Sequence, residues 1–246
     1  MASFIKQALK LALKIDLICF LKSNVLHFEL SFLTTMHDDP FQPNQRLINI
    51  GLNAADLAND ICLKEVADLF PELMARKYIT CWPGEHYRLL AAIVKFLKPK
   101  LIIEVGTHQG ASALSMKQHM INDAKIITYD IIPWHHINGT GFKQSDFDLN
   151  LEQRLIDLTI PINEESQRLV FQDADLIFVD ADKDGKMEQL FCDYFDSIKF
   201  NTKPLIIFDD IRLPNMIKIW RNIKHPKLDL TSFGHYSGTG LVDWCG

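Results

Sequence analysis

The sequence lacks an excess of positive charge, and its cysteines lack any pairing pattern. Its 246 residues include 26 lysines and arginines against 31 aspartates and glutamates, which gives a formal net charge of −5 at pH 7. A general nucleic-acid binder would carry a basic footprint, so we expect no nucleic-acid partner. The five cysteines are scattered and include no C-x-x-C pair. This argues against a disulfide framework or a zinc site and predicts a reducing, cytoplasmic location.

A long uncharged apolar run is also missing. The most apolar stretch, residues 4–33, is interrupted by charged side chains, whereas a membrane-spanning helix needs roughly 20 nearly uncharged residues. We therefore predict no transmembrane helix and no cleaved signal peptide. Lys6, Lys10 and Lys14 repeat every four residues and share one helical face. This face fits either a helix that packs on the domain or on a partner subunit, or an amphipathic helix on an anionic membrane surface.

Helical periodicity dominates the first part of the chain, and strand patterns begin at Leu101. Residues 1–80 are predicted to form a helical cap, lid or dimerisation region, and residues 81–246 a ligand-binding domain. Short runs rich in isoleucine, valine and phenylalanine then alternate with helical segments, a pattern typical of parallel strands covered on both faces. The predicted fold class is α/β, a doubly wound and mostly parallel sheet with an added helical N-terminal region. The predicted helices cover 1–36, 52–78, 85–97, 111–121, 184–199 and 214–223.

An acidic residue follows or closes each of five predicted strands, at intervals of 23 to 29 residues. Parallel strands end at the same edge of a sheet, which is where open α/β sheets bind ligands. A single acid of this kind is ordinarily a solvated loop residue or a helix cap. Five acids in step are harder to explain by stability, because clustered like charges repel one another. The five residues are Glu104, Asp130, Asp157, Asp180 and Asp209.

The first of these acids opens a glycine-containing turn, Glu104-x-Gly106-x-x-x-Gly110-x-Ser112. Glycines allow a tight strand-to-helix turn and a close ligand approach, and the helix N-terminus that follows suits a carboxylate. A dinucleotide fingerprint would need a glycine at His108, which argues against a nicotinamide-dependent oxidoreductase. An acid at the strand end suits an ammonium group, and an acid after the next strand suits a ribose. The ligand so described is S-adenosylmethionine.

Four stretches resemble the class I S-adenosylmethionine-dependent methyltransferases, most of all the catechol and caffeoyl-CoA O-methyltransferase branch and its bacterial relatives. The resemblance implies a seven-stranded sheet and in-line transfer of a methyl group to a small-molecule hydroxyl, with a homodimer as an open alternative. A second hypothesis is a catalytically silent cofactor-binding or regulatory protein of the same fold. The matching stretches are residues 103–112 (IEVGTHQGAS), 128–130 (TYD), 175–184 (DLIFVDADKD) and 206–210 (IIFDD).

The resemblance assigns a role to each predicted cofactor residue. Glu104 and Gly106 would face the methionine portion, and Gly110 precedes the helix at whose start Ser112 would hold the carboxylate. Asp130 would bind the ribose hydroxyls. Asp157 would lie near the adenine amine, after the third strand.

The same branch holds a magnesium-type cation between an aspartate after the fourth strand and an Asp-Asn pair after the fifth. Asp180 and Asp209 match the first two positions. The third position is Asp210 in this sequence, a departure that changes the charge of the site but keeps an oxygen ligand. Mg²⁺ or another divalent cation is therefore an expected second cofactor.

Without a metal, removal of the acceptor proton needs a general base. The candidates are Asp180, Asp182, Lys183 and His235. His235 belongs to a glycine-rich segment between two strand-like runs, 228–233 and 241–244, which in this fold would form a terminal hairpin beside the ligand edge. A simple exposed turn is the alternative explanation for that histidine.

Overall fold

The computed structural model describes residues 39–245, so the helix predicted over 1–36 and its lysine face lie outside this part. Contacts within the chain divide it after Pro40, and the unit Phe41–Gly246 carries all the elements described below. The predicted boundary after residue 80 stays a prediction. The roles predicted for residues 1–80 stay predictions.

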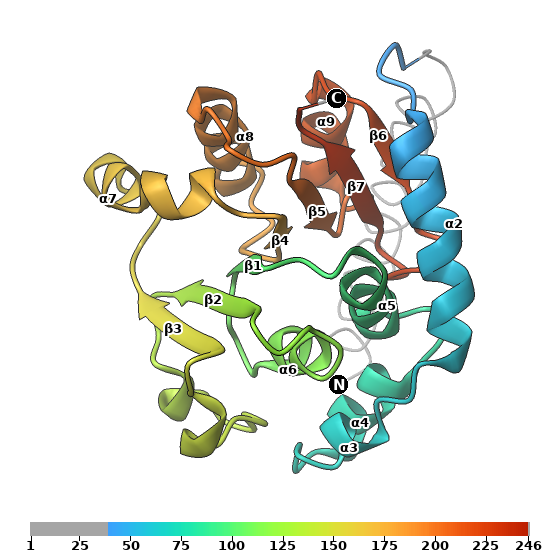
Figure 1. Ribbon diagram of the computed structural model, residues 1–246, viewed down its shortest axis with the longest axis vertical. Coiled ribbons are helices and arrows are strands. Elements are labelled where there is room, and N and C mark those ends of the chain that lie inside the picture. The colour runs from blue at the N-terminus through green and yellow to red at the C-terminus, as the bar shows by residue number, and fades with distance from the viewer. Residues whose placement is uncertain (1–38, 246) are drawn as a thin grey trace, which may run out of the picture. The chain divides into compact units, whose positions relative to one another are not determined.

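A seven-stranded sheet forms the centre of this unit, with the order β3-β2-β1-β4-β5-β7-β6 (Figure 1). The pairs from β3 to β5 are parallel, whereas β7 runs antiparallel to both β5 and β6. The predicted doubly wound, mostly parallel fold is confirmed. The strands are β1 (Leu101–Val105), β2 (Lys125–Asp130), β3 (Leu151–Leu155), β4 (Leu176–Val179), β5 (Leu205–Asp209), β6 (Lys227–Asp229) and β7 (Thr239–Asp243).

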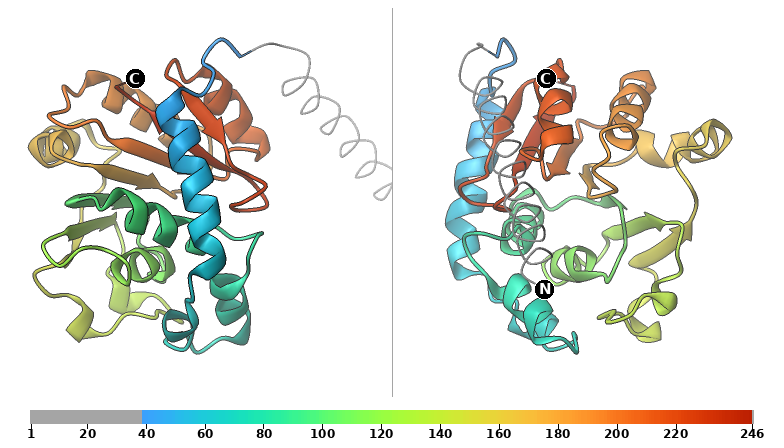
Figure 2. Two further views of the ribbon diagram at one scale, coloured as in Figure 1. Left: turned by 45° about the vertical axis from the view of Figure 1, so that its right-hand side comes forward. Right: turned by 180° about the vertical axis from the view of Figure 1, so that it is seen from behind.

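Alternate residues of each central strand enter two separate hydrophobic clusters, one on each face of the sheet. In β1, Ile102 packs with residues of α2, α5 and α6, while Ile103 packs with residues of α7, α8 and α9. The views in Figure 2 show these helices distributed over the two faces of the sheet. The helices are α2 (Gln45–Asp60), α3 (Lys64–Ala67), α4 (Leu73–Thr80), α5 (Tyr87–Leu97), α6 (Ala111–Lys117), α7 (Pro161–Gln172), α8 (Met187–Ser197) and α9 (Pro214–Asn222), with 3-10 turns η1 (Trp134–His136) and η2 (Gln144–Asp146).

Several predicted boundaries differ from the structure. The helix predicted over 52–78 is three helices, α2 to α4, and α7 was not predicted. The third strand ends at Leu155, two residues before Asp157. It lies at the edge of the sheet and is only partly buried, so its sequence has three polar residues between two leucines instead of the continuous apolar run seen in the buried central strands.

The helices of residues 45–80 share a hydrophobic cluster with the sheet domain. Leu47 of α2, Phe70 after α3 and Ile79 of α4 are almost completely buried in the cluster that also holds α5 and α6. Among the described residues, no helix combines the length and the apolar character needed to cross a membrane.

Candidate active site

Two glycines shape the turn between β1 and α6. Gly106 has a φ of +102°, and a Cβ there would lie 1.9 Å from the carbonyl oxygen of Asp180. Gly110 has a φ of +87° and would place a Cβ 2.2 Å from the Phe142 ring. Both positions therefore require glycine for backbone conformation and for space. The close approach at Gly106 brings the ends of β1 and β4 together.

Glu104 is fully buried at the end of β1. Its Oε1 accepts a hydrogen bond from the Ser112 hydroxyl, whereas its Oε2 has no hydrogen-bond partner in the described part of the chain. Burial raises the pKa of Glu104 to about 7, although the nearby hydroxyl groups of Ser112 and Thr128 oppose this. An unpartnered oxygen of a buried carboxyl group is a ready acceptor for an ammonium group.

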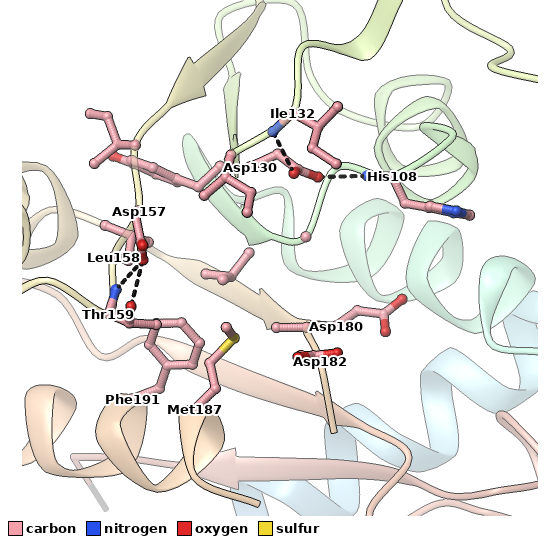
Figure 3. Close-up of a pocket in the computed structure, with 16 residues that line it drawn as sticks. His108, Asp130, Ile132, Asp157, Leu158, Thr159, Asp180, Asp182, Met187 and Phe191 are labelled. Carbon is pink, nitrogen blue, oxygen red and sulfur yellow. Dashed lines mark hydrogen bonds between the residues drawn. The ribbon is translucent and has the colours of Figure 1, made fainter. Parts of the chain in front are cut away.

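Asp130 closes β2 and is held by three backbone N–H groups. Its Oδ2 accepts from Thr107 and His108, each at 3.0 Å, and its Oδ1 accepts from Ile132 at 3.0 Å. Two of these donors lie in the glycine turn. The carboxylate thus ties β2 to the turn after β1 and fixes its own position at the carboxyl edge of the sheet (Figure 3).

A cavity of about 550 Å³ opens at this edge. Polar groups lie around it and apolar side chains cover part of its wall: Asp130, Asp157 and Asp180 come from three strand ends, while Met187 and Phe191 come from α8 (Figure 3). Asp157 accepts hydrogen bonds from the backbone and hydroxyl of Thr159, at 2.9 and 2.6 Å. A cavity with these walls suits a ligand that is apolar in one part and rich in hydroxyls in another.

The predicted cofactor residues divide into two groups around this cavity. Gly106, Asp130 and Asp157 line it. The remaining three, Glu104, Gly110 and Ser112, are not among its lining residues. Sequence reasoning did not find the apolar wall from α8, because Met187 and Phe191 look like ordinary core residues of an amphipathic helix.

Next to this cavity, Lys183 joins two predicted metal-site carboxylates. Its Nζ lies 2.5 Å from Asp180 Oδ1 and 3.6 Å from Asp210 Oδ2. Burial opposes protonation of Lys183, but the charges of Asp180, Asp209 and Asp210 outweigh it and raise the lysine pKa. Lys183 is therefore protonated at neutral pH in this arrangement.

His235 lies in the loop between β6 and β7 and contacts Asp209 and Asp210, the second of which it shares with Lys183. Its Nδ1 is 3.1 Å from Asp209 Oδ2 and 3.2 Å from Asp210 Oδ1, and its Nε2 is 3.5 Å from Glu85 Oε2. Burial lowers the histidine pKa, but Asp209 and Asp210 outweigh this effect and raise it to about 10. The hairpin loop is fixed by a hydrogen bond from the Tyr236 N–H to the Gly84 carbonyl.

Sequence reasoning missed His86. This residue precedes α5 and is almost completely buried, with Nδ1 3.3 Å from Asp209 Oδ1. Burial raises the pKa of Asp209, but the two histidines outweigh it and hold this pKa well below its usual range. The sequence points to this region only through the neighbouring pair Gly84-Glu85, which resembles the same O-methyltransferase branch.

The residues present fit a divalent cation. Among the described residues, groups of three ligand atoms within 4.8 Å of one another occur as His86–Asp180–Asp209, as Asp209–Asp210–His235 and as Glu85–His86–His235. Asp209 belongs to two of these groups, but Asp180 and Asp210 do not occur together in any of them, so the predicted set of Asp180, Asp209 and Asp210 is not itself such a group among the described residues. Carboxylate oxygens are suitable ligands for hard cations.

Comparisons with known proteins agree with this architecture. A family model described as O-methyltransferase matches residues 55–207. The SAH-bound methyltransferase PaMTH1 of Podospora anserina has a TM-score of 0.50 and 17% identity, covering 80% of this chain and 88% of that chain. The O-methyltransferase from Bacillus cereus in complex with SAH has a TM-score of 0.46 and 15% identity, covering 82% of this chain and 92% of that chain.

At such low identity, the likeness to PaMTH1 shows a shared fold. The search of curated proteins gave no match. The family model covers more than half of the chain and includes the strand ends that carry Glu104, Asp130 and Asp180. The chain belongs to the O-methyltransferase family.

Proposed function

We propose that this enzyme transfers a methyl group from S-adenosylmethionine to a hydroxyl oxygen of a small molecule. The observation that carries the proposal is the cavity at the carboxyl edge of the sheet, with Asp130, Asp157 and Asp180 around it. The partly buried cluster of carboxylates, histidines and Lys183 adjoins it through Asp180. Family membership favours the enzyme over the catalytically silent alternative.

The methyl donor would occupy the cavity of Figure 3. Its ammonium group would pair with the unpartnered Glu104 Oε2, and Gly106 would let its methionine portion approach the main chain. Asp130 would bind the ribose hydroxyls, and Asp157 would lie near the adenine. Bound there, S-adenosylmethionine supplies a methyl group on a sulfonium for in-line displacement, in which positioning carries much of the catalysis.

The acceptor oxygen would lie beside Lys183 and His235. Both side chains are held protonated by neighbouring carboxylates, so they stabilise negative charge on that oxygen. A divalent cation on Asp180 and Asp209 would offset the charges that raise the lysine pKa. Lys183 Nζ would then be able to accept the hydroxyl proton.

The finer assignments belong to the same proposal. The scattered cysteines support a cytoplasmic location, and the four described ones, Cys62, Cys81, Cys192 and Cys245, are free. Residues 1–80 would act as a cap, lid or dimer surface, with membrane contact through the lysine face as the alternative. The acceptor would be a small molecule and not a nucleic acid, in keeping with the net charge of −5.

Calorimetry with S-adenosylmethionine and its demethylated product tests the proposal. We expect binding by the wild type and a loss of roughly tenfold or more in the Asp130→Ala variant, since each lost charged hydrogen-bond partner costs about 1.5–3 kcal/mol. Asp123→Ala, in an exposed turn before β2, is the matched control and should bind normally. Absence of binding by the wild type, or unchanged binding by Asp130→Ala, would contradict the cofactor assignment. Binding without methyl transfer to any hydroxyl acceptor would favour the silent alternative.

A further inference from the structure

His86 has two buried nitrogen atoms that make no hydrogen bond to the described residues, although its Nδ1 lies within ion-pair distance of Asp209. Within the described part of the chain, neither its Nδ1 nor its Nε2 has a hydrogen-bond partner, and the same holds for Asp209 Oδ1. The imidazole and the carboxylate oxygen face each other at 3.3 Å without the alignment of a hydrogen bond. Burying polar atoms unpaired is costly, so this pair indicates a missing ligand between or beside them.

Neighbouring side chains hold the His86 ring in place, and Lys183 and His235 occupy one oxygen each of Asp180 and Asp209. Aromatic rings of Tyr87 and Phe178 pack against it at centroid distances of 4.4 and 5.4 Å. Lys183 forms an ion pair with Asp180 Oδ1, and His235 forms one with Asp209 Oδ2. The available atom of Asp209 is therefore the oxygen on the side of His86.

One donor atom each from His86, Asp180 and Asp209 lies within 4.8 Å of the others. These three residues come from three different places: the start of α5 and the ends of β4 and β5. The donor set is one imidazole nitrogen and two carboxylates, which leaves coordination positions for water or an acceptor oxygen. It differs from the all-oxygen set expected from the sequence, in which Asp210 was the third ligand.

We propose that His86 is a direct ligand of the divalent cation, together with Asp180 and Asp209, and that the site accordingly selects an imidazole-binding metal over Mg²⁺. This inference rests on the proposed function of the site. Mg²⁺ and Ca²⁺ favour oxygen ligands, whereas Mn²⁺, Fe²⁺, Co²⁺ and Zn²⁺ accept imidazole nitrogen with increasing readiness. The metal preference of this chain is thus set by a residue outside the predicted carboxylate triad.

Metal titration of the full chain tests the inference without measuring turnover. Calorimetry would give the affinities for Co²⁺, Mn²⁺ and Mg²⁺, and pulsed electron paramagnetic resonance of bound Mn²⁺ would detect a directly coordinated nitrogen. We expect one site, Co²⁺ bound more tightly than Mg²⁺, and a nitrogen coupling in the wild type. In His86→Gln the Co²⁺ affinity should fall by roughly tenfold or more, since even outer-shell partners of metal ligands contribute this much.

His119→Gln is the matched control, because His119 Nε2 is also buried without a hydrogen-bond partner in the described chain but belongs to none of the ligand groups. Its metal affinities should equal those of the wild type. A wild type that binds Mn²⁺ without nitrogen coupling, that prefers Mg²⁺, or that binds no metal would overturn the inference. Equal Co²⁺ affinity of His86→Gln and wild type would do the same.

His235 belongs to the neighbouring group Asp209–Asp210–His235, so the nitrogen coupling of the wild type should persist in His235→Gln. This result would assign the nitrogen to His86 even if His86→Gln fails to fold, and loss of the coupling in His235→Gln would overturn the inference. Binding of S-adenosylhomocysteine by the same samples separates this inference from the proposed function. Cofactor binding without nitrogen coupling would contradict the proposal that a histidine binds the metal and would leave the methyltransferase assignment intact. Nitrogen coupling without cofactor binding would support the ligand and contradict the proposed function.

Discussion

At the scale of single residues, the ionised Glu104 carboxylate lowers the stability of the fold but is the form needed to bind a positively charged group. Its carboxyl group is completely buried at the end of β1, and burial raises its pKa to about 7 from the usual 4.5 of a glutamate. The unfolded chain therefore ionises first as the pH rises, and the folded state loses stability between about pH 4.5 and 7. A buried acid with this penalty is expected at a site that must receive a positive group.

Glu104→Gln should consequently stabilise the ligand-free protein at pH 8. The amide carries no charge to desolvate, and its oxygen can still accept from Ser112. We expect a gain of up to roughly 3 kcal/mol in the free energy of unfolding at pH 8 and little change at pH 4.5. Urea unfolding at the two pH values measures the difference. An equal effect of the substitution at both values would show that Glu104 does not titrate as described.

The same carboxyl group should make cofactor binding dependent on pH. Only the ionised form pairs with an ammonium group, so affinity for S-adenosylhomocysteine should decrease as the pH falls below about 7. Calorimetry from pH 5.5 to 8 would follow this change. In Glu104→Gln the affinity should be low and nearly independent of pH, and a wild-type slope that persists in this variant would assign the titration to another group.

The sequence pattern located the acids at the strand ends but not the side chains that contact them. Asp130, Asp157 and Asp180 were found because each follows a strand, and strand ends can be read from apolar runs. His86 was not found, because nothing in the local sequence distinguishes a histidine aimed at a carboxylate from one that simply precedes a helix. Asp209, the carboxylate that His86 faces, belongs to a strand more than one hundred residues later in the chain.

At the scale of elements, the turn between β1 and α6 depends on glycine conformation. Gly110 serves as the N-cap of α6 in the left-handed region, and the Phe142 ring fills the place of a side chain there. The segment that includes Phe142 was the least predictable part of the sequence. Its aromatic residues, Trp134, Phe142 and Phe147, pack against one another over the α6 side of the sheet.

Gly110→Ala should therefore destabilise the protein by about 1–3 kcal/mol, through backbone strain and overpacking against Phe142. Thermal unfolding would measure the loss. Gly51→Ala is the control, because Gly51 lies inside α2 and a Cβ there meets only the flexible ends of Leu228 and Leu230. A Gly110→Ala protein as stable as the Gly51→Ala protein would contradict the strain argument.

Elements with strong periodicity were predicted, and elements that depend on context were not. The central strands are buried on both faces, so their apolar runs are continuous in sequence. β3 and α7 lie towards one edge of the sheet, where β3 is half-buried and Leu169 of α7 is largely exposed. Their patterns are correspondingly weak, because partial burial places fewer constraints on each position.

At the scale of the whole molecule, the unit Phe41–Gly246 contains every residue that lines the cavity. In the part of the chain that the structure describes, its two hydrophobic clusters, one on each face of the sheet, are formed by residues between 47 and 244. A chain that begins at residue 39 should thus unfold cooperatively and bind S-adenosylhomocysteine like the full chain. Denaturant unfolding and calorimetry would test this, and a failure of the shortened chain to bind would show that residues 1–38 contribute to the site.

The sequence by itself determined the fold class, the family and the edge of the sheet where Asp130, Asp157 and Asp180 gather, because these depend on strand periodicity and on short motifs that are local in the chain. The tertiary structure decided which groups meet at that edge. Asp209 lies between His86 and His235, which approach it from the start of α5 and from the β6–β7 loop. Such meetings depend on how distant segments pack, and a single sequence carries no local pattern for them.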